Sequence, residues 1–153
     1  MIWLTVSAGI AAGDLLIRRL VRSRLSEGEN RPLPGGKAVL TKSFNKGAAM
    51  GLLADRPQLL RNFSLASLGL MGISLIRARA GRRKLAAAGS AMVIGGGAGN
   101  IMERMKEGRV TDYIRFPSLP GRLGKLVFNI SDFAIFAGMI LTLIGGGKHG
   151  DDR

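Results

Sequence analysis

Apolar residues gather in four runs along the chain, and polar, mostly basic stretches separate them. The runs cover about residues 1–17, 62–76, 85–101 and 126–144. Each is close to, or slightly shorter than, the roughly 20 residues that cross the hydrocarbon core of a bilayer. The aliphatic stems of flanking arginine and lysine can extend such a run. The pattern predicts a mainly α, integral membrane protein with a bundle of four transmembrane helices.

The first run has the position of a secretory signal peptide. It lacks a basic n-region and a clear small-residue cleavage site, and Asp14 interrupts its apolar sequence. We therefore expect a helix that stays in the protein.

The pattern changes between the first two runs. Residues 27–36 are rich in glycine, proline and charge, which predicts a loop. Residues 37–45 favour an extended strand, and Asn45-Lys46-Gly47 favours a turn. A second extended stretch is expected at 110–112, after a turn at Gly108. We predict one domain over 1–153, with a small sheet outside the membrane core at about 26–55 and a flexible tail at 145–153.

The 153-residue chain combines 46% hydrophobic residues, a net charge of +13 and a mean hydropathy of +0.20. The basic residues lie mostly between the runs, and the stretch 77–84 is the most basic. The positive-inside rule places this stretch in the cytoplasm, and four alternating spans then place both termini there. The arginines that follow the first run oppose this orientation: Arg18, Arg19, Arg22 and Arg24.

Composition excludes several classes of function. A soluble nucleic-acid binder is disfavoured, because basic and apolar residues are segregated and aromatic residues make up only 5% of the chain. The chain has no cysteine, so thiolate metal sites and cysteine nucleophiles are excluded. Its single histidine, His149, lies in the polar tail, which argues against a histidine-dependent triad. We expect neither a metal nor another cofactor.

Small residues fill much of the third run, at 86–90 and 95–99, and Gly138 lies in the fourth. In a membrane such residues let helix backbones approach closely. At the end of the third run, Asn100, Glu103 and Arg104 introduce polar groups into an apolar segment, where they default to a functional interpretation.

Two aspartates flank the hairpin that joins the third and fourth runs. Asp112 follows the third run, and Asp132 lies inside the fourth, three residues after Asn129 on the same predicted helix face. The loop between the runs returns the chain to the same membrane face, so the two carboxyl groups can approach. Close carboxyl groups in a dry site share one proton, which suits aspartic-protease chemistry.

Structural alternatives stand beside this hypothesis. Asp112 could cap a helix or form half of an ion pair, and Asp132 could pair with Arg104. Asp14 and Arg18 are four residues apart, which favours a helical ion pair. We expect Glu103 and Arg104 to be structural as well, and the Arg104 guanidinium could hold a neighbouring carboxylate or a lipid phosphate.

Four motifs, in order, resemble the signal peptidase II family. GGGAGNIMERMKEGRVTDYI and FNISDFAI resemble its two aspartate motifs, FNKGAAMG resembles its N-x-GAAFG, and Asp14 with Arg18 resembles its first-helix Asp-x-x-x-Lys. The resemblance implies four membrane helices with a small extracytoplasmic β-cradle. It implies an aspartic endopeptidase that removes signal peptides from diacylglyceryl-modified bacterial prolipoproteins.

The resemblance also assigns residues and partners. The catalytic dyad falls on Asp112 and Asp132, and five residues fall on substrate-binding or supporting positions: Asp14, Asn45, Asn100, Arg104 and Asn129. The implied partners are lipidated prolipoproteins, membrane lipids and globomycin-type inhibitors, with no nucleic acid. We expect a multi-pass monomer in the bacterial cytoplasmic (inner) membrane, with cytoplasmic termini.

The chain departs from the family pattern at four positions, none of them in the dyad. Glu103 replaces the usual Asp, Arg18 replaces Lys, Met50 replaces an aromatic residue and Ser131 replaces Ala. These changes leave a second hypothesis open, a divergent or catalytically silent paralogue that binds lipoproteins without cleaving them.

Overall fold

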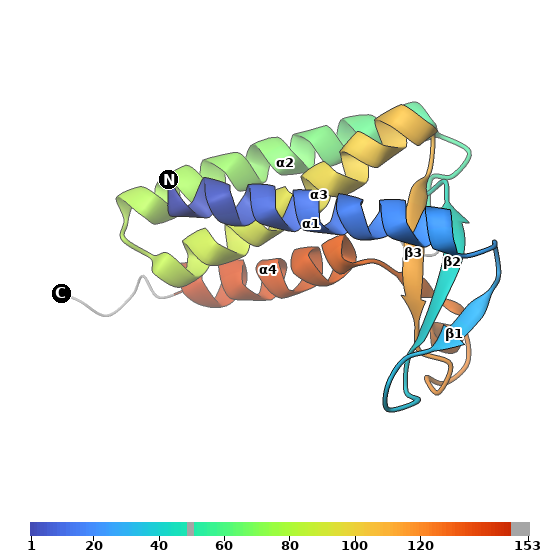
Figure 1. Ribbon diagram of the computed structural model, residues 1–153. Coiled ribbons are helices and arrows are strands. Elements are labelled where there is room, and N and C mark those ends of the chain that lie inside the picture. Colours follow the sequence, from blue (N-terminus) through green and yellow to red (C-terminus); the bar gives the residue numbers. More distant parts are fainter. Residues whose placement is uncertain (49–50, 148–153) are drawn as a thin grey trace.

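The computed structural model describes residues 1–48 and 51–147. Within them the protein is mainly helical, with one small antiparallel sheet at one end of the helices (Figure 1). The helices are α1 (Ile2–Arg24), α2 (Pro57–Ala80), α3 (Lys84–Glu107) and α4 (Ile130–Gly146). The strands are β1 (Asn30–Pro32), β2 (Val39–Asn45), β3 (Val110–Arg115) and β4 (Val127–Phe128). A 3₁₀ turn, Leu123–Lys125, precedes β4.

The four apolar runs all form helices, but their bounds differ from the predictions. Helix α1 continues beyond its apolar run to Arg24. The run ends before Arg18, but Arg18 pairs with the acidic side chains of Asp14 and Glu103 and is therefore buried within the helix. Helix α4 begins at Ile130 and not near 126, because Val127 and Phe128 pair with β3. In the described residues, α2 and α3 are long and apolar enough to cross a membrane, whereas α4 is apolar and shorter.

The sheet has the strand order β1-β2-β3-β4, and every pairing is antiparallel. Extended structure was expected at 37–45 and 110–112, and both predictions are confirmed by β2 and β3. The prediction of a loop over 27–36 is wrong in part, since Asn30 to Pro32 pair with Thr41 to Val39. The ladder between β2 and β3 is irregular between Leu40 and Ser43.

Helix α3 lies at the centre of the helical packing, against α1, α2 and α4. Its glycines permit the contacts: a Cβ atom on Gly89 would lie 2.5 Å from the Gly138 carbonyl oxygen, and one on Gly96 would lie 2.5 Å from that of Ser131. A Cβ on Gly95 would lie 2.6 Å from the Ser7 carbonyl oxygen of α1. The predicted close approach of backbones through small residues is confirmed.

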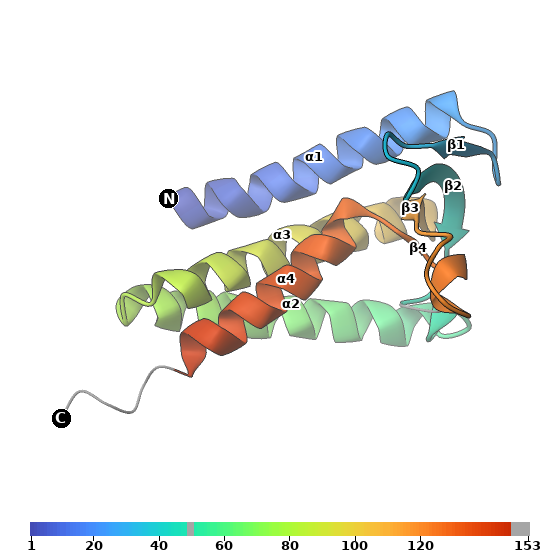
Figure 2. The ribbon, with the colours of Figure 1, turned by 90° about the horizontal axis from the view of Figure 1, so that it is seen from below.

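The two ends of the helical part differ. Figures 1 and 2 show the sheet at one end, and the start of α1 with the turn between α2 and α3 at the other. This turn belongs to the basic stretch 77–84. The predicted tail lies mostly outside the described residues, and so does His149.

Candidate active site

Asp112 and Asp132 meet through one asparagine. Asp112 lies on β3, Asp132 lies in the first turn of α4, and Asn129 immediately precedes that helix. The Asn129 side-chain Nδ2 donates a hydrogen bond to Asp112 Oδ1 at 2.6 Å. Its backbone N–H donates to Asp132 Oδ2 at 3.0 Å. Both carboxyl groups therefore accept a hydrogen bond from the same residue, Asn129.

Local sequence explains how Asn129 reaches this position. The spacing predicts that Asn129 and Asp132 share a helix face. This prediction is wrong, because Asn129 is the N-cap of α4 and precedes the helix. Its Oδ1 accepts a hydrogen bond from the Asp132 N–H at 3.0 Å, and Asp132 Oδ2 in turn accepts one from the Asn129 N–H. This capping box satisfies two N–H groups at the helix start and fixes both side chains.

Burial raises the pKa of Asp112 to about 7, and the nearby charge of Asp132 adds to the increase. Hydrogen bonds from Asn129 and Asn45 oppose it. Asn45 reaches Asp112 from the neighbouring strand β2, and its Oδ1 accepts from the Gly47 N–H at 2.9 Å, which forms the predicted turn. Asp112 is thus a carboxyl group that can hold a proton near neutral pH.

Asp14 and Arg18 form the predicted ion pair at 2.5 Å, and both are buried. Arg18 also donates to Glu103 on α3 at 2.6 Å. Glu103 accepts two further hydrogen bonds from Thr111, one from its N–H at 3.0 Å and one from its hydroxyl at 2.7 Å. The expectation that Glu103 is structural is confirmed, since it ties α1, α3 and β3 together.

Asn100 links this ion-pair network to Asp132. Its Oδ1 accepts from Arg18 Nη2 at 2.6 Å, and its Nδ2 donates to Asp132 Oδ1 at 3.2 Å. Both oxygens of Asp132 therefore accept hydrogen bonds, one from Asn100 and one from Asn129. The network fixes the orientation of this carboxyl group.

Arg104 has a different partner from the one considered in the sequence. Its Nη2 donates to the Gly47 carbonyl oxygen at 2.7 Å, which connects α3 to the turn after β2. Among the described residues Arg104 forms no ion pair with Asp132, so the structural alternative for that aspartate is not realised.

Sequence reasoning missed two residues of the site. The Tyr113 hydroxyl donates to Asp14 Oδ1 at 2.6 Å and accepts from the Ile130 N–H at 3.2 Å, so it joins α1 to the start of α4. The Ser131 hydroxyl and N–H both donate to Asp14. Ser131 had been noted only as a departure from the family pattern. The available signal was Asp14 inside an apolar run, because a carboxylate has about four acceptor sites and one arginine cannot fill them all. Met50, another departure, lies outside the described residues.

The arrangement has a defined chemical capacity. A protonated carboxyl group can donate to a carbonyl oxygen, while a neighbouring carboxylate can take a proton from water. Both tasks need the two groups held on one small site, and Asn129 provides that.

Comparisons with known proteins bear on this site. A family model described as signal peptidase (SPase) II matches residues 6–146. The lipoprotein signal peptidase of Azoarcus sp. (strain BH72) is 32% identical over 152 residues, which is 96% of this chain and 85% of that protein. The lipoprotein signal peptidase of Moorella thermoacetica is 29% identical over 154 residues, covering 98% of both chains.

Solved structures share the fold. A structure described as a bacterial membrane enzyme superposes with a TM-score of 0.78 at 18% identity, over 99% of this chain and 93% of that one. A second such structure gives a TM-score of 0.76 at 19% identity, over 97% and 94% of the two chains.

Proposed function

The chain belongs to the signal peptidase II family, and we propose that it is an intramembrane aspartic endopeptidase. Its substrates in this proposal are diacylglyceryl-modified bacterial prolipoproteins, from which it removes the signal peptide. The observation that carries the proposal is the convergence of Asp112 and Asp132 on Asn129 in a chain that matches the family over residues 6–146.

In the proposed mechanism the two aspartates divide the proton transfers. Asp132 takes a proton from water, whose oxygen adds to the scissile carbonyl carbon, and protonated Asp112 donates to the carbonyl oxygen. The C–N bond then breaks, the leaving amine takes the proton from Asp132, and Asp112 takes back one hydroxyl proton of the intermediate, which releases a carboxylic acid and restores the dyad. The raised pKa of Asp112, about 7, supports its assignment as the proton donor.

The surrounding residues position this pair. Asn129 orients both carboxyl groups through its hydrogen bonds. Asn100 bonds to both Arg18 and Asp132, so the buried arginine helps to position that aspartate. Asp14 fixes the start of α4 by accepting from Ser131. Asn45 holds Asp112 from the neighbouring strand. Arg104 holds the Gly47 turn after β2.

Exposed apolar side chains support the membrane placement. Phe63, Leu70 and Ile76 on α2 are 66%, 63% and 69% exposed, and Phe136 and Leu143 on α4 are 64% and 76% exposed. Such surfaces are unfavourable in water and favourable in lipid. We propose that all four helices cross the cytoplasmic membrane as a single domain.

The proposed orientation follows from the two unlike ends. The basic turn at 77–84 lies at the same end as the start of α1, opposite the sheet (Figure 1). Placing that end in the cytoplasm satisfies the positive-inside rule and makes the sheet an extracytoplasmic cradle. We further propose that the protein acts as a monomer in contact with membrane lipids, and that globomycin-type inhibitors occupy the dyad.

The test is a cleavage assay with purified protein in detergent and a diacylglyceryl-modified prolipoprotein. The expected product is a polypeptide whose N-terminal residue is the lipidated cysteine, measured by mass spectrometry, and globomycin should suppress its formation. Binding of the substrate without any product would contradict the proposal and favour the catalytically silent paralogue.

A further inference from the structure

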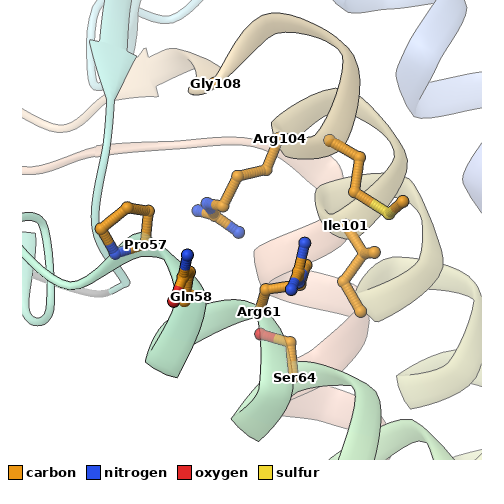
Figure 3. A pocket seen from close by; sticks show the side chains of 8 residues that line it. Pro57, Gln58, Arg61, Ser64, Ile101, Arg104 and Gly108 are labelled. Carbon is orange, nitrogen blue, oxygen red and sulfur yellow. The ribbon is translucent and has the colours of Figure 1, made fainter.

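A cavity of about 240 Å³ lies between the first two turns of α2 and the last turns of α3 (Figure 3). Six side chains that give it its chemistry are Gln58, Arg61, Ser64, Ile101, Arg104 and Met105. The cavity therefore has two guanidinium groups and a hydroxyl on one part of its wall and apolar side chains on another. Its lining contains no acidic residue.

The two arginines reach the cavity from opposite helices. Figure 3 shows Arg61 extending from α2 and Arg104 extending from α3 into the space between them. Neither forms an ion pair with an acidic group in the described part of the chain. The Nε of Arg104 is buried and has no hydrogen-bond partner among those residues. Two like charges around an unsatisfied buried donor point to an anionic ligand.

The start of α2 adds to the positive field at the same place. Its N-cap, Arg56, provides no side-chain cap, and its first turn contains no acidic residue. The N–H groups of a first helical turn lack intrahelical partners and carry partial positive charge, which favours phosphate. Pro57 and Gln58 of this turn line the cavity, so the uncapped helix start and the two guanidinium groups act on one volume.

The lining also indicates what the anion is attached to. Met105 lines the cavity from α3 and is 67% exposed. A ligand with a phosphate group and acyl chains can satisfy the arginines and cover this apolar side chain together. Because α2 is long and apolar enough to cross a membrane, its first turn lies at the depth of lipid head groups.

We propose that this cavity binds the phosphodiester of an anionic membrane phospholipid, with Arg61 and Arg104 as its ligands. The diacylglyceryl-modified substrate of the proposed cleavage reaction has no phosphate at its lipid, so this is a separate lipid site beside the dyad. Arg61 contributes to phosphate binding, whereas Arg104 also holds the Gly47 turn.

The test is calorimetric titration of the full-length protein in an uncharged detergent with dioctanoyl phosphatidylglycerol. Dioctanoylglycerol, which lacks the phosphate, and inorganic phosphate serve as comparison ligands. We expect phosphatidylglycerol to bind, and Arg61→Gln to weaken its binding by about tenfold, because a charge-assisted hydrogen bond is lost. Arg61→Lys keeps the charge but not the planar fork, so it should have an intermediate effect.

The matched control is Arg79→Gln, an exposed arginine in the last turn of the same helix. It removes the same charge far from the cavity and should leave the affinity unchanged. If the Arg61 and Arg79 variants lose equal affinity for phosphatidylglycerol, the effect comes from the net charge of the protein and the proposal is overturned. Binding of inorganic phosphate as tightly as the lipid would assign the site to free phosphate. Neither readout needs turnover, so a failure here is distinct from failure of the peptidase proposal.

Discussion

Arg18 is a buried cation that connects three polar side chains of the site. It bonds to Asp14, Glu103 and Asn100, and its side chain has no exposed surface. A buried ion pair contributes little net stability against an apolar replacement, but removing one partner leaves an uncompensated buried charge. The unusual Glu103 fits this role, since its longer side chain reaches Arg18 and Thr111 together.

The first prediction concerns Glu103→Gln. This change removes a charge that pairs with buried Arg18, so it should lower the free energy of unfolding by about 3–5 kcal/mol. Denaturation with sodium dodecyl sulfate in mixed micelles measures the effect. The control is Glu107→Gln, because Glu107 is 37% exposed and its pair with Arg22 spans 3.7 Å. It should change stability by less than about 1 kcal/mol, and an equal loss in both variants would refute the role assigned to Glu103.

The second prediction is a pH dependence. The pKa of Asp112 is raised from 3.8 to about 7, so the cleavage rate should fall as pH rises through that value and the proton donor is lost. Asn45 opposes the increase in the pKa, and Asn45→Ala should therefore move the falling limb to higher pH. The measurement is kcat/KM for cleavage between pH 5 and 9. A rate that keeps rising beyond neutral pH would contradict this assignment.

The same shift has a consequence for stability. The folded protein binds the Asp112 proton more tightly than the unfolded chain, so the free energy of unfolding falls as pH rises from 3.8 to about 7. Asp112→Asn removes this loss while keeping an acceptor for Asn129. The variant should accordingly gain thermal stability relative to the wild type as pH rises, which unfolding curves at pH 5 and 8 will show.

Some of the site could be predicted from the sequence and some could not. Asp112 and Asp132 stood out because a carboxyl group near or inside an apolar run needs a reason, and the hairpin between the runs brought them to one end. Tyr113 and Ser131 did not stand out, since an aromatic and a hydroxyl residue are ordinary in a strand and a helix. Their function in the network depends on Asp14, which is distant in the chain.

At the scale of elements, helix α3 determines the positions of the others. Its glycines allow α1 and α4 to approach within backbone contact, and Gly96 faces the carbonyl oxygen of Ser131, directly before Asp132. The existence of the four helices followed from their apolar runs. Their ends did not, because Arg18 continues α1 through tertiary contacts and β4 shortens α4 through strand pairing.

A pair of neighbouring glycines tests this packing. Gly96→Ala would place a Cβ atom 2.5 Å from the Ser131 carbonyl oxygen, which cannot move without α4, so both stability and cleavage should fall. Gly97→Ala would meet only the side chain of Leu68, at 2.7 Å, which can change rotamer. We expect at least a tenfold larger loss of activity in the Gly96 variant, by about 1.4 kcal/mol or more. Equal activity in the two would show that the α3–α4 contact does not position Asp132.

At the scale of the whole molecule, the two ends of the helices differ in charge and structure. One end carries the start of α1 and the basic turn after α2, and the other carries the sheet (Figure 2). Asp112 lies on β3 of that sheet, and Asp132 lies in the first turn of α4. Hydropathy predicted the helices. The positive-inside rule predicts a cytoplasmic basic stretch, and the arginines of α1 oppose that orientation. Burial of Arg18 and its ion pair explain why that residue does not count as a loop charge.

The orientation can be measured directly because the chain has no cysteine. Single cysteines introduced at Arg82, in the turn after α2, and at Arg31, on β1, can be treated in intact cells with a membrane-impermeant thiol reagent. The Arg31 position should be labelled and the Arg82 position protected until the membrane is permeabilised. The reverse pattern would invert the proposed topology.

The central claim is that Asp112 and Asp132 together cleave the substrate. The most direct measurement is the initial rate of prolipoprotein cleavage by wild type, Asp112→Asn and Asp132→Asn in the same detergent, with Asp55→Asn as an exposed control. Loss of either dyad carboxyl group should reduce the rate by at least roughly a thousandfold while the variants remain folded, and the control should match the wild type. A rate within tenfold of the wild type for either dyad variant would contradict the account.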